Sequence, residues 1–361
     1  MRIGMVCFPT VGGSGTLAVA LAHQLEQRGH EVTVIARDRP ARLSASARFL
    51  AVEPAEHALF EASPYTLALA RTLVLASKAR AFDVLHLHYA VPHAASALLV
   101  RDALLALAPA IVVTAHGTDV TTFGADPGHA PILAASLRAA DVVTTPSRFL
   151  ADRARDALGI DATVVPNFVD TDVFHPIARG AHHGPLALIH VSSFRPVKAT
   201  GALVPMMHAL GDDARLTLVG DGPDRERVRA AASDRMELVG AVREPERVAA
   251  LLARSDLFVL PSESESFGLA ALEALACAVP VIARRVGGLP EVVRDGVTGL
   301  LVDRVEDLAP AIRALSSERR TEMAKAAADD AKRRFAPDVV VKQYEAVYER
   351  AIRARRGVTN A

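Results

Sequence analysis

Short apolar runs alternate with longer segments of helical periodicity along the first half of the chain. We predict strands at RIGMVCF, EVTVIA, DVLHLHY, AIVVTA, DVVTTP and ATVVPN. Helical patterns such as TLAVALAHQLEQRG lie between most of these runs. Strands that alternate with helices predict a parallel sheet wound by helices.

The alternation stops at NFVDTDVFHPIARGAHHGP, which is rich in turn-forming residues, and then restarts with LALIHVS, RLTLVG, MELVG, LFVLPS and PVIARR. The restart predicts a second α/β domain. The fold class is therefore α/β, with two Rossmann-like domains that we expect to face each other across a cleft. We place the domains at residues 1–168 and 169–339. We expect a last helix, about 340–361, to pack back on the first domain and its basic end to be solvated.

Length and composition agree with a two-domain enzyme. The chain has 361 residues, 51% of them hydrophobic, and its 41 Lys and Arg balance 41 Asp and Glu. This balance argues against a nucleic-acid partner. We find no uninterrupted apolar run near the roughly 18 residues of a membrane span and no signal-peptide pattern, so we expect a cytoplasmic protein without stable membrane insertion. Cys7 and Cys277 are expected to be small core residues.

The first strand is followed by the turn VGGSG, residues 11–15, and this turn has more than one interpretation. Gly13, Gly15 and Ala18 fit G-x-G-x-x-A, a form of the dinucleotide-binding fingerprint, so an NAD(P)-dependent oxidoreductase stays open. The acidic residue that would hold the ribose, Asp38, comes late and is flanked by arginines. A looser interpretation needs only backbone N–H groups and a helix N-terminus near any phosphate or carboxylate. A tight turn without a ligand is the third alternative.

The segment SESESFGLAALEALAC places two carboxylates, Glu265 and Glu273, around a predicted strand-to-helix turn. If the helix begins near Phe267, Glu273 lies almost two turns in, with the N–H groups of Phe267 and Gly268 between the carboxylates. The helix N-terminus favours phosphate and the carboxylates accept hydrogen bonds from hydroxyls, so the arrangement suits a nucleotide sugar. The alternative is that Glu265 caps the helix and Glu273 is merely exposed.

Two cations follow the first strand of the second domain, in HVSSFRPVK. Arg195 and Lys198 could neutralise a diphosphate leaving group there, or they could be ordinary surface residues.

Several motifs in order along the chain resemble one enzyme family. Glu265-x7-Glu273, VGDGP, RVGGLPEVVRDGVTGLLV and the Gly-rich opening resemble the retaining, nucleotide-sugar-dependent glycosyltransferases of family 4. The resemblance covers nearly the whole chain and implies the GT-B fold, with an acceptor-binding N-terminal domain and a nucleotide-sugar-binding C-terminal domain.

Longer strings narrow the resemblance to the malate-glycosylating members of that family. These strings are RIGMVCFPTVGGSG, LHLHYAVPHA, VVTAHGTDVT, VPNFVDTDVF and HVSSFRPVK. They imply a hexosaminyltransferase that moves N-acetylglucosamine from UDP-N-acetylglucosamine to the hydroxyl of L-malate with retention, the first step of bacillithiol biosynthesis. A sugar, a lipid or an inositol phosphate stays open as the acceptor.

The resemblance also assigns roles to residues on the donor side. Glu273 would hold the ribose, Glu265 the transferred sugar and adjoining phosphate, and Lys198 with Arg195 the diphosphate. His116 would lie beneath the sugar. The remaining nucleotide-sugar contacts would come from Gly13, Gly220, Val242, Arg243, Ser266, Phe267 and Gly268.

Malate carries two carboxylates, so its pocket needs donors and cations. The residues expected to bind it are Ser14, Tyr89, Thr118, Asn167 and Arg195. Family members usually carry an arginine where this chain has Ser193, which leaves open whether Arg195 serves the diphosphate or malate.

We expect no metal and no cofactor. The string DTD at Asp170–Asp172 imitates a metal motif of another glycosyltransferase fold but lies in the inter-domain turn, and His86 and His88 are expected on one face of a buried strand. Ala278 stands where relatives usually have glycine; a left-handed conformation there would cost about 1 kcal/mol. Self-association into a homo-oligomer stays open.

Overall fold

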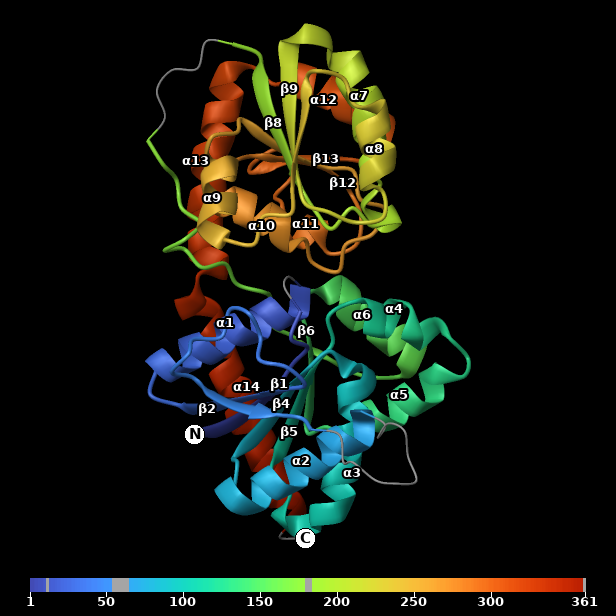
Figure 1. Cartoon of the computed structure of the whole chain (residues 1–361), viewed down its shortest axis with the longest axis vertical. Helices are drawn as coiled ribbons and strands as arrows, with labels where there is room; N and C mark the ends of the chain where they lie inside the picture. Colours follow the sequence, from blue (N-terminus) through green and yellow to red (C-terminus); the bar gives the residue numbers. More distant parts are fainter. Residues whose placement is uncertain (11–12, 54–64, 179–183, 360–361) are drawn as a thin grey trace. The chain divides into compact units, whose positions relative to one another are not determined.

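The structure is a computed structural model that describes residues 1–10, 13–53, 65–178 and 184–359. The chain divides into two compact units (Figure 1). The first comprises Met1–Pro166 together with Val340–Ala361, and the second is Asn167–Val339.

The first unit is built on a parallel sheet of seven strands in the order β3-β2-β1-β4-β5-β6-β7. Its strands are β1 Arg2–Val6, β2 Glu31–Ala36, β3 Arg48–Ala51, β4 Val84–His88, β5 Ala110–Thr114, β6 Val142–Thr145 and β7 Thr163–Val164. The order reverses between β1 and β4, which is the doubly wound topology of dinucleotide-binding folds.

Helices connect these strands and cover both faces of the sheet. They are α1 Gly13–Gln27, α2 Tyr65–Arg80, α3 Ala90–Leu104, α4 Thr118–Thr121, α5 His129–Arg138, α6 Arg148–Leu158 and α14 Pro337–Thr359, with 3-10 turns η1 Leu105–Leu107 and η2 Phe123–Ala125. The helices α2, α3 and α5 share one hydrophobic core with β1, β4 and β5, through residues such as Leu69, Val100 and Leu87.

The C-terminal helix α14 packs on the other face of β4. Tyr348 is fully buried and its hydroxyl hydrogen-bonds His86 at 2.8 Å, while Glu345 pairs with His30 at 3.0 Å. The basic end is not simply solvated, because Arg355 donates to the carbonyls of Ala108 and Leu105. The expectation of a free basic tail is therefore wrong over its helical part.

The second unit repeats the same strand order in a sheet of six parallel strands, β10-β9-β8-β11-β12-β13. These are β8 Leu186–Val191, β9 Ala214–Val219, β10 Met236–Gly240, β11 Leu257–Leu260, β12 Val281–Arg284 and β13 Gly299–Val302. Its helices are α7 Leu203–Leu210, α8 Arg225–Ala231, α9 Pro245–Ala253, α10 Leu269–Ala276, α11 Leu289–Val292, α12 Leu308–Arg313 and α13 Ser317–Phe335. Its 3-10 turns are η3 Pro196–Lys198, η4 Thr200–Ala202, η5 Gly211–Asp213 and η6 Val305–Asp307.

Alternate residues of the second sheet face two separate cores, as the period of a strand requires. Ile189 and Phe258 pack with α9, α10 and α13, whereas their neighbours Leu188 and Leu257 pack with α7 and α12. Because both faces are covered, most residues of these strands are apolar, which explains why short apolar runs identified them.

The sequence patterns found most strands but not all. The run ATVVPN forms only the two-residue strand β7. Two edge strands were missed: β3 is short and only half-buried, and β13, sequence GLLV, follows a turn-rich stretch and offers too few residues for a periodic signal. In the turn-rich segment after residue 167, the described residues Phe168, Val169 and Phe174 are buried.

One described segment, Ala90–Leu107, is long and apolar enough by composition to cross a membrane, with 39% of it buried inside the fold. It consists of α3 and η1 and contains Arg101 and Asp102. Its buried residues, such as Ala97 and Val100, share the hydrophobic core with α2 and α5, whereas Leu99, Leu105 and Leu107 are exposed.

Ala278 adopts the left-handed conformation that the sequence comparison with relatives raised, with φ +58° after the end of α10. A side chain is disfavoured there, so we expect Ala278→Gly to raise the free energy of unfolding by up to about 1 kcal/mol. Urea unfolding measures the change. Ala326→Gly, inside α13, is the matched control and should lower stability by about the same amount; a destabilised Ala278→Gly protein would contradict the assignment.

Candidate functional site

In doubly wound sheets, ligands bind beyond the carboxyl ends of the strands where the strand order reverses. In the first unit this point lies between β1 and β4, and in the second between β8 and β11. The segments that follow these strands contain the Gly-rich turn, Tyr89, Lys198 and Glu265. The loops that carry the sequence motifs therefore lie at the expected ligand-binding edge of each sheet. The first unit contributes the Gly-rich turn and Tyr89, and the second contributes Lys198 and Glu265.

Lys198 and Glu265 meet in the second unit. The Lys198 Nζ donates to Glu265 Oε1 at 2.7 Å, and the Ser262 hydroxyl donates to the same oxygen at 2.8 Å. The two charged side chains are only 18% and 9% exposed. The loops that carry them are paired through the amide of Glu263 and the carbonyl of Val197. A buried pair of this kind holds a cation and a carboxylate in fixed positions, ready to exchange partners with an anionic, hydroxyl-bearing ligand.

The helix after Glu265 begins two residues later than predicted, at Leu269 rather than near Phe267. Gly268 precedes it with φ +98°, and a Cβ there would lie 2.4 Å from the Leu289 side chain, so only glycine fits. Glu273 is consequently the fifth residue of α10, about 6 Å from its start at about 1.5 Å per residue. Glu265 does not cap the helix, since the structure gives α10 no side-chain cap.

The segment RVGGLPEVVRDGVTG contacts the backbone of Glu265. The amide of Gly288 donates to the Glu265 carbonyl at 2.8 Å, and a Cβ on Gly287 would lie 1.9 Å from that carbonyl oxygen. The two backbones touch because Gly287 has no side chain. In the sequence, the glycine pair Gly287 and Gly288 is the signal for this close approach of two backbones.

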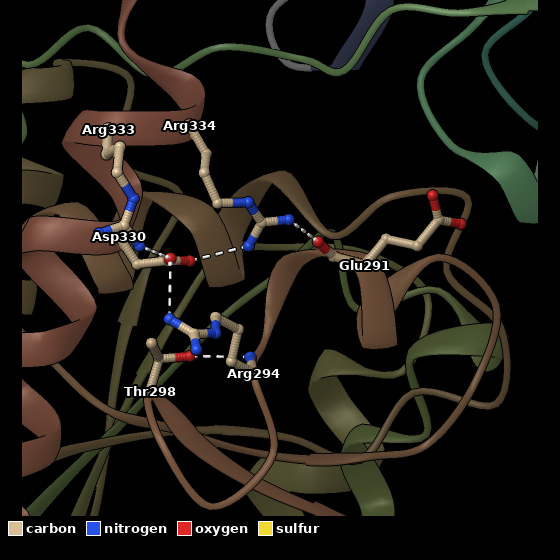
Figure 2. A network of polar contacts seen from close by, with 6 residues as sticks. All are labelled: Glu291, Arg294, Thr298, Asp330, Arg333 and Arg334. Atoms are coloured by element: carbon tan, nitrogen blue, oxygen red, sulfur yellow. Dashed lines mark hydrogen bonds and ion pairs between the residues drawn. The ribbon is translucent and has the colours of Figure 1, made fainter.

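The same segment is fastened to α13 by a buried carboxylate. Figure 2 shows Asp330, with 1% of its surface exposed, facing three arginines. Arg333 and Arg334 contact it at 2.6 and 2.8 Å and Arg294 at 3.4 Å, and Arg334 also donates to the Glu291 carbonyl. Because Arg294 and Glu291 belong to the segment that contacts Glu265, this network holds that segment in place against α13.

Phe267 is a buried residue of the loop between Glu265 and α10. Its ring is 3% exposed and meets Phe335, the last residue of α13, edge-on at a centroid distance of 5.8 Å. The aromatic pair holds the loop between Glu265 and α10 by packing. Of the other residues expected near the nucleotide, Ser266, Val242 and Glu273 are half-buried, and Arg243 is exposed.

Gly220 brings the GDGP turn against the loop after β8. Its φ is +130°, and a Cβ would lie 1.8 Å from the Ser192 carbonyl oxygen, so the turn requires glycine. Arg195, which is exposed, reaches back so that its Nε donates to the Ser193 hydroxyl at 3.2 Å. The side chain at position 195 thus lies against the place where relatives usually carry their arginine.

A buried histidine supports the loop that leads to Lys198. The Nδ1–H of His190 donates to the Val259 carbonyl at 2.8 Å, and its Nε2 accepts from the Ser192 hydroxyl at 2.8 Å. Ser192 in turn accepts the amide of Phe194. Burial lowers the pKa of His190 to about 4, so this chain contains a neutral imidazole at physiological pH.

In the first unit, the Gly-rich turn leads directly into α1. Gly13 is the first helical residue, with φ +61°, and Ser14 is half-buried. A Cβ on Gly15 would lie 2.4 Å from the Phe8 carbonyl oxygen, so that glycine lets the helix approach the end of β1. Val11 and Gly12 lie outside the described residues.

Tyr89 and Thr118, both expected to bind the acceptor, come together. Tyr89 follows β4 with φ +76°, Thr118 begins α4, and their hydroxyls are hydrogen-bonded to each other. The Tyr89 ring also meets Phe8 edge-on at 5.5 Å. Two hydroxyls presented side by side are suitable partners for a carboxylate.

His116 lies on a stack of buried histidines. Its Nε2 is 3.1 Å from His88 Nδ1, and the His88 ring lies 4.1 Å from His86, whose Nε2 contacts Thr114 at 2.7 Å. Burial lowers the pKa of His116 to about 4, of His86 to about 3 and of His88 well below its usual value. The expectation that His86 and His88 share one face of a buried strand is confirmed.

The neutral state of these rings limits what His116 can do. His88 Nε2 is buried without a partner in the described part of the chain, and a bare lone pair there costs less than an orphaned N–H. His88 therefore carries its proton on Nδ1 and donates it to His116, which leaves His116 protonated on Nδ1. The Nδ1–H of His116 can therefore donate a hydrogen bond to a ligand, but His116 cannot act as a base through that nitrogen.

The structure groups the expected residues by unit. Ser14, Tyr89, Thr118 and His116 lie in the first unit, whereas Asn167, 8% exposed, begins the second. In the DTD string, the Asp170 side chain accepts the amide of Asp172 in a local turn. Among the described residues no His, Cys, Asp and Glu side chains form a cluster with metal-binding geometry. Both cysteines are buried, which raises their pKa to about 12, as expected of core residues.

Comparison with known proteins identifies the chain as a glycosyltransferase. The model of Glycosyltransferase Family 4 matches residues 11–173, and that of Glycosyl transferases group 1 matches residues 185–318. The structure of sucrose-phosphate synthase from Thermosynechococcus elongatus superposes with a TM-score of 0.81 at 20% identity, covering 98% of this chain and 99% of that one. The two sheets thus form the GT-B fold.

Two curated relatives add sequence similarity. The N-acetyl-alpha-D-glucosaminyl L-malate synthase of Bacillus anthracis is 35% identical over 376 aligned positions, which cover 98% of each chain. The D-inositol 3-phosphate glycosyltransferase of Mycobacterium sp. (strain KMS) is 39% identical over 188 positions, which cover 46% of this chain and 42% of the relative. The chain belongs to glycosyltransferase family 4. The oxidoreductase interpretation of Gly13 to Ala18 is set aside.

Proposed function

We propose that this enzyme transfers N-acetylglucosamine from UDP-N-acetylglucosamine to the hydroxyl of L-malate with retention of the α configuration, the first step of bacillithiol biosynthesis. The observation that carries the proposal is the end-to-end similarity to the malate synthase of Bacillus anthracis, 98% of each chain. The paired hydroxyls of Tyr89 and Thr118 suit an acceptor with carboxylates, and Ser14, Asn167 and Arg195 complete the proposed acceptor set.

Lys198 and Glu265 are the proposed core of the donor site. When the nucleotide sugar binds, Lys198 moves its hydrogen bond from Glu265 to the diphosphate, and Glu265 accepts from a sugar hydroxyl. Arg195 and the amides near Gly13 and Phe267 add positive potential. The ribose is assigned to Glu273 and the uracil to the backbone at Val242 and Arg243, beside Gly220.

The proposed chemistry needs no metal and no covalent enzyme intermediate. The bond from the anomeric carbon to the UDP oxygen breaks, and a bond to the malate hydroxyl oxygen forms on the same face. The hydroxyl proton passes to the departing phosphate. Lys198 and Arg195 stabilise the charge that grows on UDP, while His116 donates from Nδ1 to the sugar; effects of this kind contribute about 3 to 4 kcal/mol per well-placed donor.

The test is UDP release from UDP-N-acetylglucosamine with L-malate, glycerate, succinate or inositol phosphate as the acceptor. The proposal expects release that depends on malate. A preference for inositol phosphate would instead favour the function named for the mycobacterial relative, and release that ignores malate would contradict the proposal.

The Glu273 assignment makes a separate prediction. Glu273→Gln removes a charged acceptor from the second turn of α10, and hydrogen bonds to charged groups contribute about 1.5 to 3 kcal/mol. We expect the dissociation constant of UDP, measured by calorimetry, to rise at least about tenfold. Glu246→Gln, in the first turn of α9, is the matched control; unchanged UDP affinity in Glu273→Gln would remove the residue from the site.

A further inference from the structure

Asp119 is a fully buried carboxylate at the start of α4, with 0% of its surface exposed. Its oxygens accept backbone N–H groups from two different turns. The amides of His116 and Gly117 lie 3.1 and 2.7 Å away, that of Val120 lies 3.2 Å away, and that of Ala90 lies 3.0 Å away. A charge buried this deeply is tolerated because several donors point at it.

The two turns joined by Asp119 each carry part of the proposed acceptor site. Ala90 directly follows Tyr89 at the end of β4, while His116 and Gly117 directly precede Thr118 at the end of β5. The two turns are neighbours because β4 and β5 pair, and the amide of Tyr89 donates to the Thr114 carbonyl at 2.9 Å. Asp119 holds both backbones at once and so fixes the distance between the two hydroxyls.

The β4 turn adopts a conformation that is costly without such support, because Tyr89 has φ +76°, where side chains are rarely found. Gly117, in the other turn, has φ +150°, which glycine adopts without strain. The Nδ1–H of His93 adds a second tie on the β4 side by donating to the His88 carbonyl at 2.7 Å. Strained turns that persist at a site are held by their surroundings.

We infer that Asp119 is a positioning residue for the acceptor: its carboxylate sets the spacing of the Tyr89 and Thr118 hydroxyls and the orientation of His116, without itself touching substrate. The inference rests on the proposed function, because it assigns these hydroxyls to acceptor binding. It adds a specificity determinant, since a carboxylate-bearing acceptor must match the spacing that Asp119 imposes.

The variant Asp119→Asn tests the inference with little change in volume. Asparagine offers one acceptor oxygen and turns an NH₂ group toward backbone donors, so it cannot satisfy both turns. We expect KM for the acceptor to rise at least tenfold and KM for the nucleotide sugar to stay within twofold, because the uracil, the ribose and the Lys198 and Arg195 contacts to the diphosphate are assigned to the second unit. Displacement of His116, which is assigned to the transferred sugar, should appear in kcat instead. The acceptor used is whichever the wild-type enzyme glycosylates.

Asp141→Asn is the matched control. The side chain of Asp141 is also largely buried, with 5% of it exposed, and it accepts from Arg101 and from the amide of Ile111. It precedes β6, at the amino edge of the same sheet, away from both turns. We expect it to lower stability but to leave both KM values unchanged. An equal rise of acceptor KM in the two variants would overturn the inference, because it would signal a general loss of stability.

An amide measurement separates this inference from the proposed function. In the wild-type protein, NMR couplings across hydrogen bonds should connect the Asp119 carboxyl carbon to the amides of both Ala90 and Gly117, and the two amide shifts should move upfield together in Asp119→Asn. These results support the positioning role of Asp119 even if malate is not the acceptor. The wild-type couplings test that role even if the variant fails to fold. Absent couplings, or an unchanged acceptor KM with moved amides, would overturn the positioning role.

Discussion

Replacing Lys198 by alanine should lower kcat by at least about two orders of magnitude while leaving the fold intact. Preorganised donors aimed at developing charge typically contribute about 10²- to 10³-fold in kcat. Lys198 is such a donor in the proposed mechanism, since its Nζ is held at 2.7 Å from Glu265 and its side chain is only 18% exposed. Steady-state turnover with saturating donor and acceptor measures the effect.

Loss of the lysine also leaves Glu265 buried without its cation, so a stability effect must be separated from the catalytic one. Arg235→Ala is the matched control, because Arg235 is 17% exposed against 18% for Lys198 and bonds the carbonyls of the η5 region at the amino edge of the same sheet. The control should lose stability but keep kcat within about twofold. Near-normal turnover in Lys198→Ala, at unchanged protein concentration and with native circular dichroism, would remove Lys198 from the reaction.

The first unit should lose stability steeply below pH 6.5. His86, His88, His93 and His116 are buried and neutral there, with burial as the main cause that lowers each pKa, to about 3 for His86 and about 4 for His93 and His116. The unfolded chain binds protons at these histidines below pH 6.5, and the folded unit does not. The stabilisation is therefore complete above pH 6.5 and is lost as pH falls toward 4.

The expected size follows from proton linkage. Each histidine that is protonated only on unfolding lowers the free energy of unfolding by about 1.4 kcal/mol per pH unit, so the four together approach about 5 kcal/mol per unit. The second unit, in which the buried His190 has its pKa lowered to about 4, should respond about one quarter as strongly. The first unit should therefore unfold first in acid.

The chain provides its own probe for this comparison. It has no Trp, and its four Tyr residues, Tyr65, Tyr89, Tyr344 and Tyr348, all belong to the first unit. Urea titrations followed by tyrosine fluorescence at pH 7.0 and 5.5 report the first unit, and hydrogen exchange in β11 and β12 reports the second. Equal acid sensitivity of the two signals would contradict the buried-histidine account.

The fold was largely predictable because both sheets are covered on two faces. Central strands such as β11, sequence LFVL, are then short apolar runs that are visible in the sequence. The edge strands β3 and β13 were not predictable, since they are short and partly exposed. The start of α10 was placed two residues early because Gly268 adopts a left-handed conformation before the helix, which no hydrophobic pattern reveals.

The site residues that belong to sequence motifs were predictable, but the contacts between them were not. Lys198 and Glu265 were found separately, but their direct contact depends on how the β8 and β11 loops pack, and the shared hydroxyl of Ser262 gives no signal in sequence. Asp119 and His190 escaped notice for a related reason. Asp119 accepts from the Ala90 amide after β4, and His190 donates to the Val259 carbonyl within β11; such backbone partners are set by tertiary structure.

The central claim is that malate receives N-acetylglucosamine from UDP. Its most direct test is product analysis by mass spectrometry and proton NMR after incubation of the purified enzyme with UDP-N-acetylglucosamine and L-malate. The account predicts one equivalent of UDP for each N-acetylglucosaminyl malate formed, with the small anomeric coupling of an α linkage. Release of UDP without a malate conjugate, or a β-linked product, would contradict it.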